Sequence, residues 1–261
     1  MTDLYLKTVY TTRAEWIVNE IFEYDIKKAN ISILLEYGYI SPEEYHMYSQ
    51  MNRINRQIAI GRMQTDKRYS EALSKGFEES RRKLCESNNL IDEEIVSIKK
   101  DAMYTLKKCH VTDFGNVHFT LRNVFRIYMR IMKLEIYFAW NEVTDSYLFD
   151  IKGISDDKLP VHTELLNRIG DILRYVQIGD LDKAIIQAFA LRTCYLNHEL
   201  PIECYREFNT DSKYRLYNSQ YYVFDLTEDE KSGWETLIDD GFNNIFLSEF
   251  HRILVEMKFT R

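Results

Sequence analysis

The stretch Glu23–Leu34 reads EYDIKKANISIL, and it marks a change of local structure in the chain. Its acidic residue Asp25 ends an apolar run that begins at Trp16 and that favours a β-strand. The apolar residues that follow, from Ala29 onward, favour a helix or a turn. A carboxylate at the end of a buried strand is suited to a two-metal phosphoryl-transfer site. Such a site also requires a second carboxylate and a basic helix.

Composition sets the outer bounds. With 261 residues, 45% of them hydrophobic, the chain is long enough for one large domain or two small ones. The net charge of −7 argues against a protein that holds nucleic acid by bulk charge alone, although it leaves room for a local basic groove. No signal-peptide pattern and no apolar run of membrane-spanning length occurs, so we expect a soluble, cytoplasmic protein with no membrane partner.

A basic helical region follows the opening stretch. Ser41 followed by Pro42 predicts a helix start, and the helix or helix pair extends to about residue 87. Its basic cluster consists of Arg53, Arg56, Arg62, Lys67 and Arg68. Arg53 and Arg56 share a helix face because they are three residues apart. A solvated helix face is the alternative interpretation of such a run.

The second carboxylate is Asp101. Residues 96–106 alternate in a way that is typical of a strand, a hairpin and a second strand, with Asp101 near the bend. We expect its side chain to be exposed at the tip of the hairpin while the flanking strands are buried.

The second half of the chain reads as helical. Apolar residues spaced by three to five positions from Phe114 to Trp140 predict a helix, on which Arg122, Arg126, Arg130 and Lys133 form a stripe. This stripe is either a second nucleic-acid surface or a plain solvent face. Further helices are predicted from Pro160 to Val176 and over 181–197, and a capping box at Thr227–Glu230.

The predicted fold class is α+β, mainly helical, with a small antiparallel sheet near the N-terminus. We expect a region 1–110 that carries the two carboxylates and a helical region 111–261, or one continuous domain.

Three motifs, taken in order, resemble DNA-dependent polymerases of the A and B families. Tyr24–Ile33 (YDIKKANISI) is similar to the first palm motif of family B, in which an Asp opens a segment that ends in Ser-Ile. Arg56–Arg62 (RQIAIGR) is similar to the fingers-helix motif. Ile98–Ala102 (IKKDA) lies where the third motif has its Asp-bearing hairpin. The resemblance covers residues 16–106, and it implies a palm-like sheet followed by a thumb-like helical region.

The resemblance also implies the chemistry. Asp25 and Asp101 become the catalytic residues and the ligands of two Mg²⁺ ions, and the partners are nucleoside triphosphates and a template or primer. The implied nucleotide-binding residues are Asn30, Arg53, Arg56, Arg62, Lys67 and Lys100. Position 30 corresponds to the place where such enzymes screen the sugar 2′ position. Because Asn30 is smaller than the Tyr or Glu of DNA-making members, we expect ribonucleotides to be accepted. The chain's small size suits a virus or a mobile element, and the cytoplasm of an infected host cell.

The chain departs from the family pattern at two points. The hairpin has the single Asp101 where family B has two Asp residues, and the Tyr-Gly pair at the end of the fingers motif is missing. Two further functions therefore stay open. One is a catalytically inactive, palm-derived protein that acts through nucleic-acid or protein contacts. The other is a helical scaffold without nucleotide chemistry.

Overall fold

The computed structural model describes residues 3–154, 159–197, 199–208, 214–217, 220–223 and 241–260. Two units with separate cores make up the fold. Unit 1 consists of Met1–Arg13 and Glu20–Val124, and unit 2 of Ala14–Asn19 and Phe125–Arg261. The expected α+β class with an antiparallel sheet is confirmed. The predicted capping box at residues 227–230 lies outside the described residues.

The sheet of unit 1 is antiparallel, and it brings distant parts of the chain together. Its strands lie in the order β1, β3, β4, β2, β6, with the short β5 paired to β6. Their bounds are β1 Val9–Thr11, β2 Trp16–Ile26, β3 Ile95–Lys99, β4 Ala102–Thr105, β5 Asp113–Phe114 and β6 Val117–Ile131. The predicted hairpin is therefore confirmed as β3 and β4, with its turn at Lys100 and Asp101.

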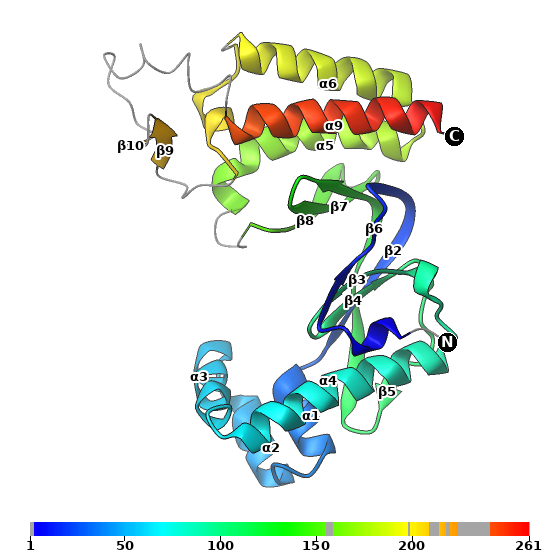
Figure 1. Ribbon diagram of the computed structural model, residues 1–261, viewed down its shortest axis with the longest axis vertical. Helices are drawn as coiled ribbons and strands as arrows, with labels where there is room; N and C mark the ends of the chain where they lie inside the picture. The colour runs from blue at the N-terminus through cyan, green and yellow to red at the C-terminus, as the bar shows by residue number, and fades with distance from the viewer. Residues whose placement is uncertain are drawn as a thin grey trace. The chain divides into compact units, whose positions relative to one another are not determined.

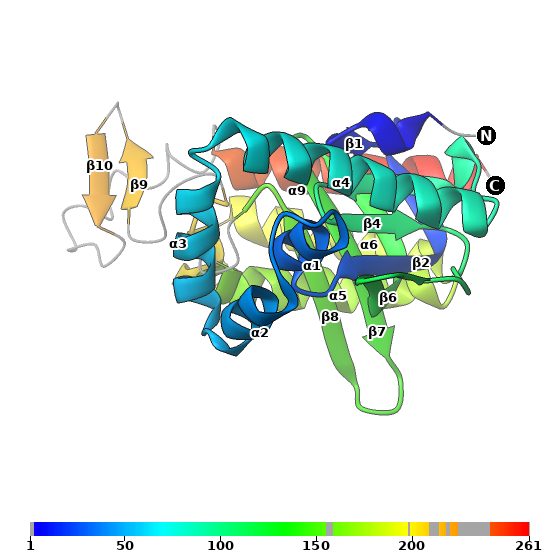
Figure 2. The ribbon, with the colours of Figure 1, turned by 90° about the horizontal axis from the view of Figure 1, so that it is seen from below.

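Four α-helices of unit 1 follow β2, namely α1 Ala29–Glu36, α2 Pro42–Gln50, α3 Arg53–Met63 and α4 Lys67–Ser87. The predicted helical region up to residue 87 is confirmed, as three helices. Ser41 caps α2 with a full capping box, as its sequence indicates. Helix α4 packs against α1 (Figure 1, Figure 2). Their apolar faces, which include Ile33 and Phe77, form one core with β2, β3 and β4.

The helix predicted from Phe114 to Trp140 is wrong. This segment forms β5, most of β6 and, from Leu134 to Asn141, β7. Burial alternates along the start of β6, where Val117 and Phe119 are buried and His118 and Thr120 are exposed. That period of two is the strand pattern, and the β-branched and aromatic residues of the segment suit a strand. The basic stripe is therefore not a helix face.

Unit 2 packs helices against a second group of strands. Strand β7 pairs with β6 and with β8 (Ser146–Lys152), and the β7–β8 hairpin stands out in Figure 2. Helices α5 (Thr163–Gln177), α6 (Leu181–Leu196) and α9 (Phe242–Phe259) lie side by side (Figure 1). A core of buried residues such as Phe138, Ile169 and Phe250 joins strands and helices. A separate hairpin consists of β9 (Tyr214–Tyr217) and β10 (Gln220–Val223).

Short 3-10 helices occupy Leu4–Leu6 (η1), Asp92–Glu94 (η2), Leu159–His162 (η3) and Ile202–Tyr205 (η4). Among the described residues, no helix combines the length and the apolar character that a membrane crossing requires. Residues 111–124, expected in the second region, belong to unit 1, because the first part of β6 pairs beside β2.

Candidate functional site

Strand pairing in unit 1 places Asp25 beside the turn that carries Asp101. Asp25 lies in register with Ala102, the residue directly after Asp101. The Ile26 N–H donates a hydrogen bond to the Asp101 carbonyl, with 3.2 Å between nitrogen and oxygen. Two carboxylates that are far apart in the sequence therefore meet at one end of the sheet.

Both carboxylates line one pocket of about 250 Å³. Four positively charged side chains line it as well, two of them from α3. The polar and charged lining residues are Asp25, Lys28, Asn30, Arg53, Arg56, Gln57, Asp101 and Arg122. Asp101 is half-buried, so the expectation that it is exposed at the hairpin tip is wrong.

The electrostatics of the pocket centre on Asp25. Burial, and after it the nearby Asp101, raise the pKa of its carboxyl to about 6, while Arg122 acts in the opposite direction. The Arg122 Nη1 lies 3.0 Å from the Asp25 Oδ2. A half-buried acid beside a second acid is poorly compensated, and such a place favours an added cation.

Two other cations of the pocket are oriented by backbone carbonyls of the α2–α3 region. The Lys28 Nζ donates to the Ser49 carbonyl at 3.3 Å, and the Arg56 Nη1 donates to the Met51 carbonyl at 3.3 Å. Lys28 itself has a left-handed backbone (φ 52°) and precedes the first residue of α1. These bonds hold positive charge toward the pocket without neutralising it.

Asn30 supplies a buried polar atom to the same pocket. Its Oδ1 is buried and has no hydrogen-bond partner among the described residues. Buried polar atoms are normally satisfied, so an exception of this kind calls for a water, an ion or a ligand group. Asn30 lies in the first turn of α1, directly after β2.

A buried arginine of α4 donates hydrogen bonds that hold the turn with Asp101 in place. Arg81 of α4 is 2% exposed, and its Nη1 donates to the Lys100 carbonyl at 2.8 Å. Its Nε donates to the Tyr5 carbonyl at 2.8 Å. Lys100 has a left-handed backbone (φ 57°), and its N–H donates to the Thr8 carbonyl. The position of Asp101 thus depends on contacts with both α4 and the N-terminal segment.

Three of the predicted nucleotide-binding residues are not among the described residues that line the pocket. Arg62 is exposed in the last turn of α3. Lys67 pairs with Glu71 at the surface, and the Lys100 Nζ lies over the Phe77 ring. These three residues lie in the segments expected to form the nucleotide site, but their side chains do not line the pocket. By contrast, Asp25, Asn30, Arg53, Arg56 and Asp101 come together as predicted.

Sequence reasoning missed Lys28, Gln57 and Arg122 as pocket residues. Lys28 and Gln57 stand inside two of the quoted motifs, so spacing from Asp25 and Arg56 could have indicated them. Arg122 was placed on a helix, although it belongs to β6 beside β2. The alternation at Val117–Phe119 was the signal for that strand.

The donor set fits a magnesium ion that is shared with a substrate. Mg²⁺ is usually held by one or two carboxylates, several waters and substrate phosphates. Asp25 and Asp101 supply two carboxylates in one pocket. In the described part of the chain, no group of three or more His, Cys, Asp or Glu side chains could hold a metal ion by itself. A metal held by protein groups alone therefore does not fit.

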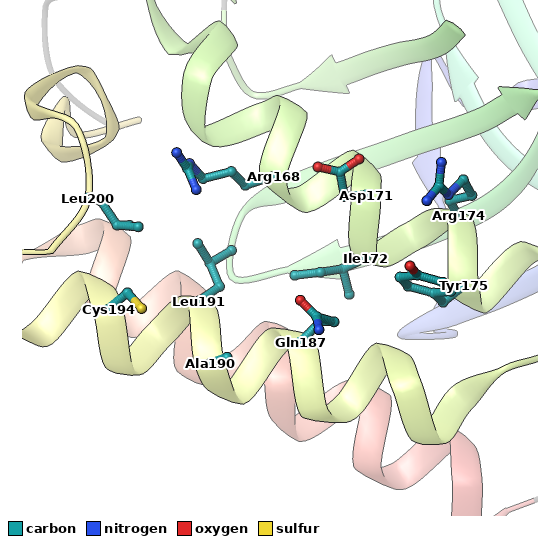
Figure 3. Close-up of a pocket in the computed structure, with 10 residues that line it drawn as sticks. All are labelled: Arg168, Asp171, Ile172, Arg174, Tyr175, Gln187, Ala190, Leu191, Cys194 and Leu200. Atoms are coloured by element: carbon teal, nitrogen blue, oxygen red, sulfur yellow. The ribbon is translucent and has the colours of Figure 1, made fainter. Parts of the chain in front are cut away.

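A larger pocket of about 450 Å³ lies between α5 and α6 in unit 2 (Figure 3). Its charged groups are engaged by other parts of unit 2. Arg168 pairs with Glu164, and Asp171 accepts a hydrogen bond from the Tyr147 hydroxyl. Arg174 lies near Asp145 and over the Trp140 ring. Despite its size, this pocket has no convergent set of reactive groups, so the smaller one is the candidate site.

In a comparison with known proteins, one family model matches nearly the full length of the chain. The model of the family described as Bacteriophage PBS1 gene 130 protein matches residues 1–256. None of the curated proteins matches the chain.

Proposed function

The chain belongs to the family of the Bacteriophage PBS1 gene 130 protein, and we propose that it is a nucleotidyltransferase of a phage. In this proposal it adds nucleotides to a nucleic acid by two-metal phosphoryl transfer, in a polymerase-like pocket of unit 1. Its place of action is the infected host cell. Nucleoside triphosphate and a nucleic-acid primer or template are its partners.

One observation carries the proposal. Two carboxylates from β2 and the β3–β4 turn, an α3 face with two arginines, and Arg122 all line one pocket. The acidic side chains suit divalent cations, and the basic side chains suit phosphates. Both kinds of charge in one pocket are what triphosphate chemistry requires. It supports a catalytic interpretation more than a solvated helix face.

Each residue has a distinct role in the proposed reaction. Asp25 and Asp101 would hold Mg²⁺, which supplies activation of the attacking hydroxyl and neutralises the leaving pyrophosphate. Arg53 and Arg56 bind phosphate oxygens, a task for which the planar guanidinium is well matched. Asn30 lies beside the sugar, where its unpaired Oδ1 is available to accept a hydrogen bond. Arg81 holds the Asp101 turn in place.

A single-nucleotide incorporation assay tests the proposal. The wild type is compared with Asp25→Asn and Asp101→Asn, on a labelled primer–template with Mg²⁺ or Mn²⁺ and either NTPs or dNTPs. We expect incorporation by the wild type and a loss of at least about 100-fold in both variants, because each removes a charge from the metal site. Asp92→Asn is the control, since Asp92 is exposed and lies outside the pocket. Equal activity of wild type and both site variants would refute the proposal.

A second candidate function is a binding protein that keeps the pocket without catalysis. The single Asp of the β3–β4 turn favours it, together with the lack of a larger acidic group around that turn in the described residues. In this case the wild type shows no incorporation, but it binds nucleotide or nucleic acid. Asp25→Asn then keeps or strengthens that binding, because it removes a negative charge from beside the ligand phosphates.

A further inference from the structure

Arg122 lies beside the Asp25 carboxylate, where the proposed divalent ion would bind. Its guanidinium lies 3.0 Å from the Asp25 carboxylate, inside the pocket that also holds Asp101. The Asp25 side chain is only 20% exposed, whereas the Arg122 side chain is 59% exposed. The carboxylate is therefore fixed in the wall, and the arginine reaches it from solvent.

This ion pair is easy to open. The guanidinium is exposed to water, which competes for its hydrogen bonds, and the long arginine side chain regains rotamer freedom when it leaves. The other pocket cations differ, since Lys28 and Arg56 donate to backbone carbonyls of unit 1. Of these three cations, Arg122 is thus the one best placed to move, and it is the one paired with Asp25.

A divalent ion on Asp25 would compete with the Arg122 guanidinium for the same carboxylate. Mg²⁺ binds carboxylate oxygen at about 2.0–2.1 Å, and it would lie within a few ångströms of the guanidinium. Two positive centres at that distance repel each other in a half-buried site. The arrival of the ion therefore weakens the ion pair and favours its opening.

We propose that Arg122 is an exchangeable cation, which pairs with Asp25 in the empty site and moves to the phosphates of the nucleotide when the divalent ion binds. The proposal rests on the proposed function, because it assumes that the pocket takes a metal and a triphosphate. Its consequence is coupling. Metal binding releases an arginine that strengthens nucleotide binding, and by reciprocity nucleotide strengthens metal binding.

The test measures the two ligands separately on the full chain. Mn²⁺ binding without nucleotide is followed by electron paramagnetic resonance, and ATP binding at saturating Mg²⁺ by calorimetry. For Arg122→Gln we expect Mn²⁺ to bind roughly 3- to 5-fold more tightly, because the competing cation is gone. We expect ATP to bind roughly 10-fold more weakly, because a charge-assisted contact is lost. These opposite signs are the signature of exchange.

The matched control is Arg68→Gln. Arg68 also pairs with an aspartate, Asp66, but at the surface and outside the pocket. It should leave both affinities unchanged. Arg122→Lys keeps the positive charge but not the planar guanidinium. It should therefore bind Mn²⁺ about as weakly as the wild type does, and it should lose part of the ATP affinity.

The outcomes separate the two proposals. If the wild type binds Mn²⁺, Asp25→Asn abolishes this binding and Arg122→Gln leaves it unchanged or weaker, the metal site stands and the exchange is overturned. If neither wild type nor Arg122→Gln binds Mn²⁺, the proposed function and the exchange both fail.

Discussion

At the scale of single residues, Asp25 is a reactive group that is kept in the fold although it lowers the stability of the folded state. Its carboxyl is half-buried beside Asp101, and its pKa is raised to about 6. Natural proteins accept such destabilising groups where activity needs them. The side chain of Asn30, with a buried and unpaired oxygen in the described structure, is a second group in the same pocket whose burial is unfavourable. Two such groups in one pocket indicate a ligand more strongly than either one alone.

The Asp25 carboxyl predicts a pH-dependent stability. Because its folded-state pKa of about 6 lies above the 3.8 of an unperturbed aspartate, the folded state holds the proton more tightly than the unfolded state does. Asp25 therefore destabilises the folded state increasingly from about pH 4 to pH 6, and by a constant amount above that, about 1–3 kcal/mol. Asp25→Asn should raise the melting temperature at pH 8 and have little effect at pH 4.

Thermal unfolding of both proteins across this pH range measures the difference. Asp92→Asn, an exposed substitution outside the pocket, should not reproduce it. A melting-temperature difference that is the same at pH 4 and pH 8 would contradict the assignment to Asp25.

Asn30 predicts the sugar preference of the proposed enzyme. Asn30→Tyr places a large side chain at the position that the polymerase resemblance assigns to sugar screening. We expect the wild type to use NTPs, and the variant to lose NTP use by roughly 10- to 100-fold relative to dNTPs, through steric exclusion of the 2′-hydroxyl. Incorporation with each pool gives the ratio. Asn30→Ala, which adds no bulk, should leave NTP use in place.

At the scale of elements, the contact between α1 and α4 depends on a glycine. A Cβ at Gly76 of α4 would collide with Ile33 Cγ2 of α1. Gly76→Ala should therefore lower the free energy of unfolding by about 1–2 kcal/mol, because overpacking outweighs the gain in helix propensity. Denaturant unfolding checks this value.

Gly61 in α3 provides the opposite case. Nothing lies within 4 Å of a Cβ added there, so Gly61→Ala should stabilise the protein by about 0.5–1 kcal/mol. The α1–α4 contact would be looser than described if both substitutions stabilised the protein.

Arg81 links α4 to the turn of the candidate site. Arg81→Met leaves the Tyr5 and Lys100 carbonyls unsatisfied, and we expect a loss of about 2–4 kcal/mol in the free energy of unfolding. Arg81→Lys keeps one donor group and should lose less. Both variants should also bind Mn²⁺ more weakly at temperatures where they remain folded, since Asp101 follows Lys100 directly.

Arg82→Lys serves as the comparison, because Arg82 pairs with Glu79 and Glu86 at the helix surface and makes no contact with the turn that the described structure records. Its cost to the free energy of unfolding should be small compared with that of the Arg81 substitutions. Normal Mn²⁺ affinity in a folded Arg81→Lys would remove the positioning role.

At the scale of the whole molecule, net charge limits how nucleic acid is held. The chain carries −7 overall, while Lys28, Arg53, Arg56 and Arg122 concentrate positive charge in one pocket. If these four residues supply the phosphate contacts, the logarithm of the affinity for a single strand should fall with the logarithm of salt concentration with a slope no steeper than about −3.

The slope is measured by fluorescence anisotropy with a labelled oligonucleotide. The salt concentration is varied from about 50 to about 300 mM, a range over which such plots are roughly linear. Arg56→Gln should reduce it by roughly one contact. A slope near −6 would mean that another basic surface of the molecule carries the binding.

Local signals were strong enough to predict much of unit 1. Ser41 and Pro42 begin α2 as their types dictate, and the alternation around Asp101 predicts the β3–β4 hairpin. The same reasoning was wrong for β6 and β7, because a long apolar segment with spaced arginines satisfies a helical and a strand period at once. Local sequence patterns also did not predict which side chains point into the pocket. Arg62 and Arg56 share a helix, but of these two only Arg56 is among the described residues that line the pocket.

By itself the sequence determined that Asp25 ends a strand, that helices follow it and that Asp101 lies in a tight turn. These are consequences of short-range residue patterns. That the two carboxylates meet, that Arg122 joins them from β6, and that Arg62, Lys67 and Lys100 stay outside was decided by the tertiary structure alone. The reason is strand pairing. Register joins residues through backbone hydrogen bonds between distant segments, and it leaves no local trace in the sequence.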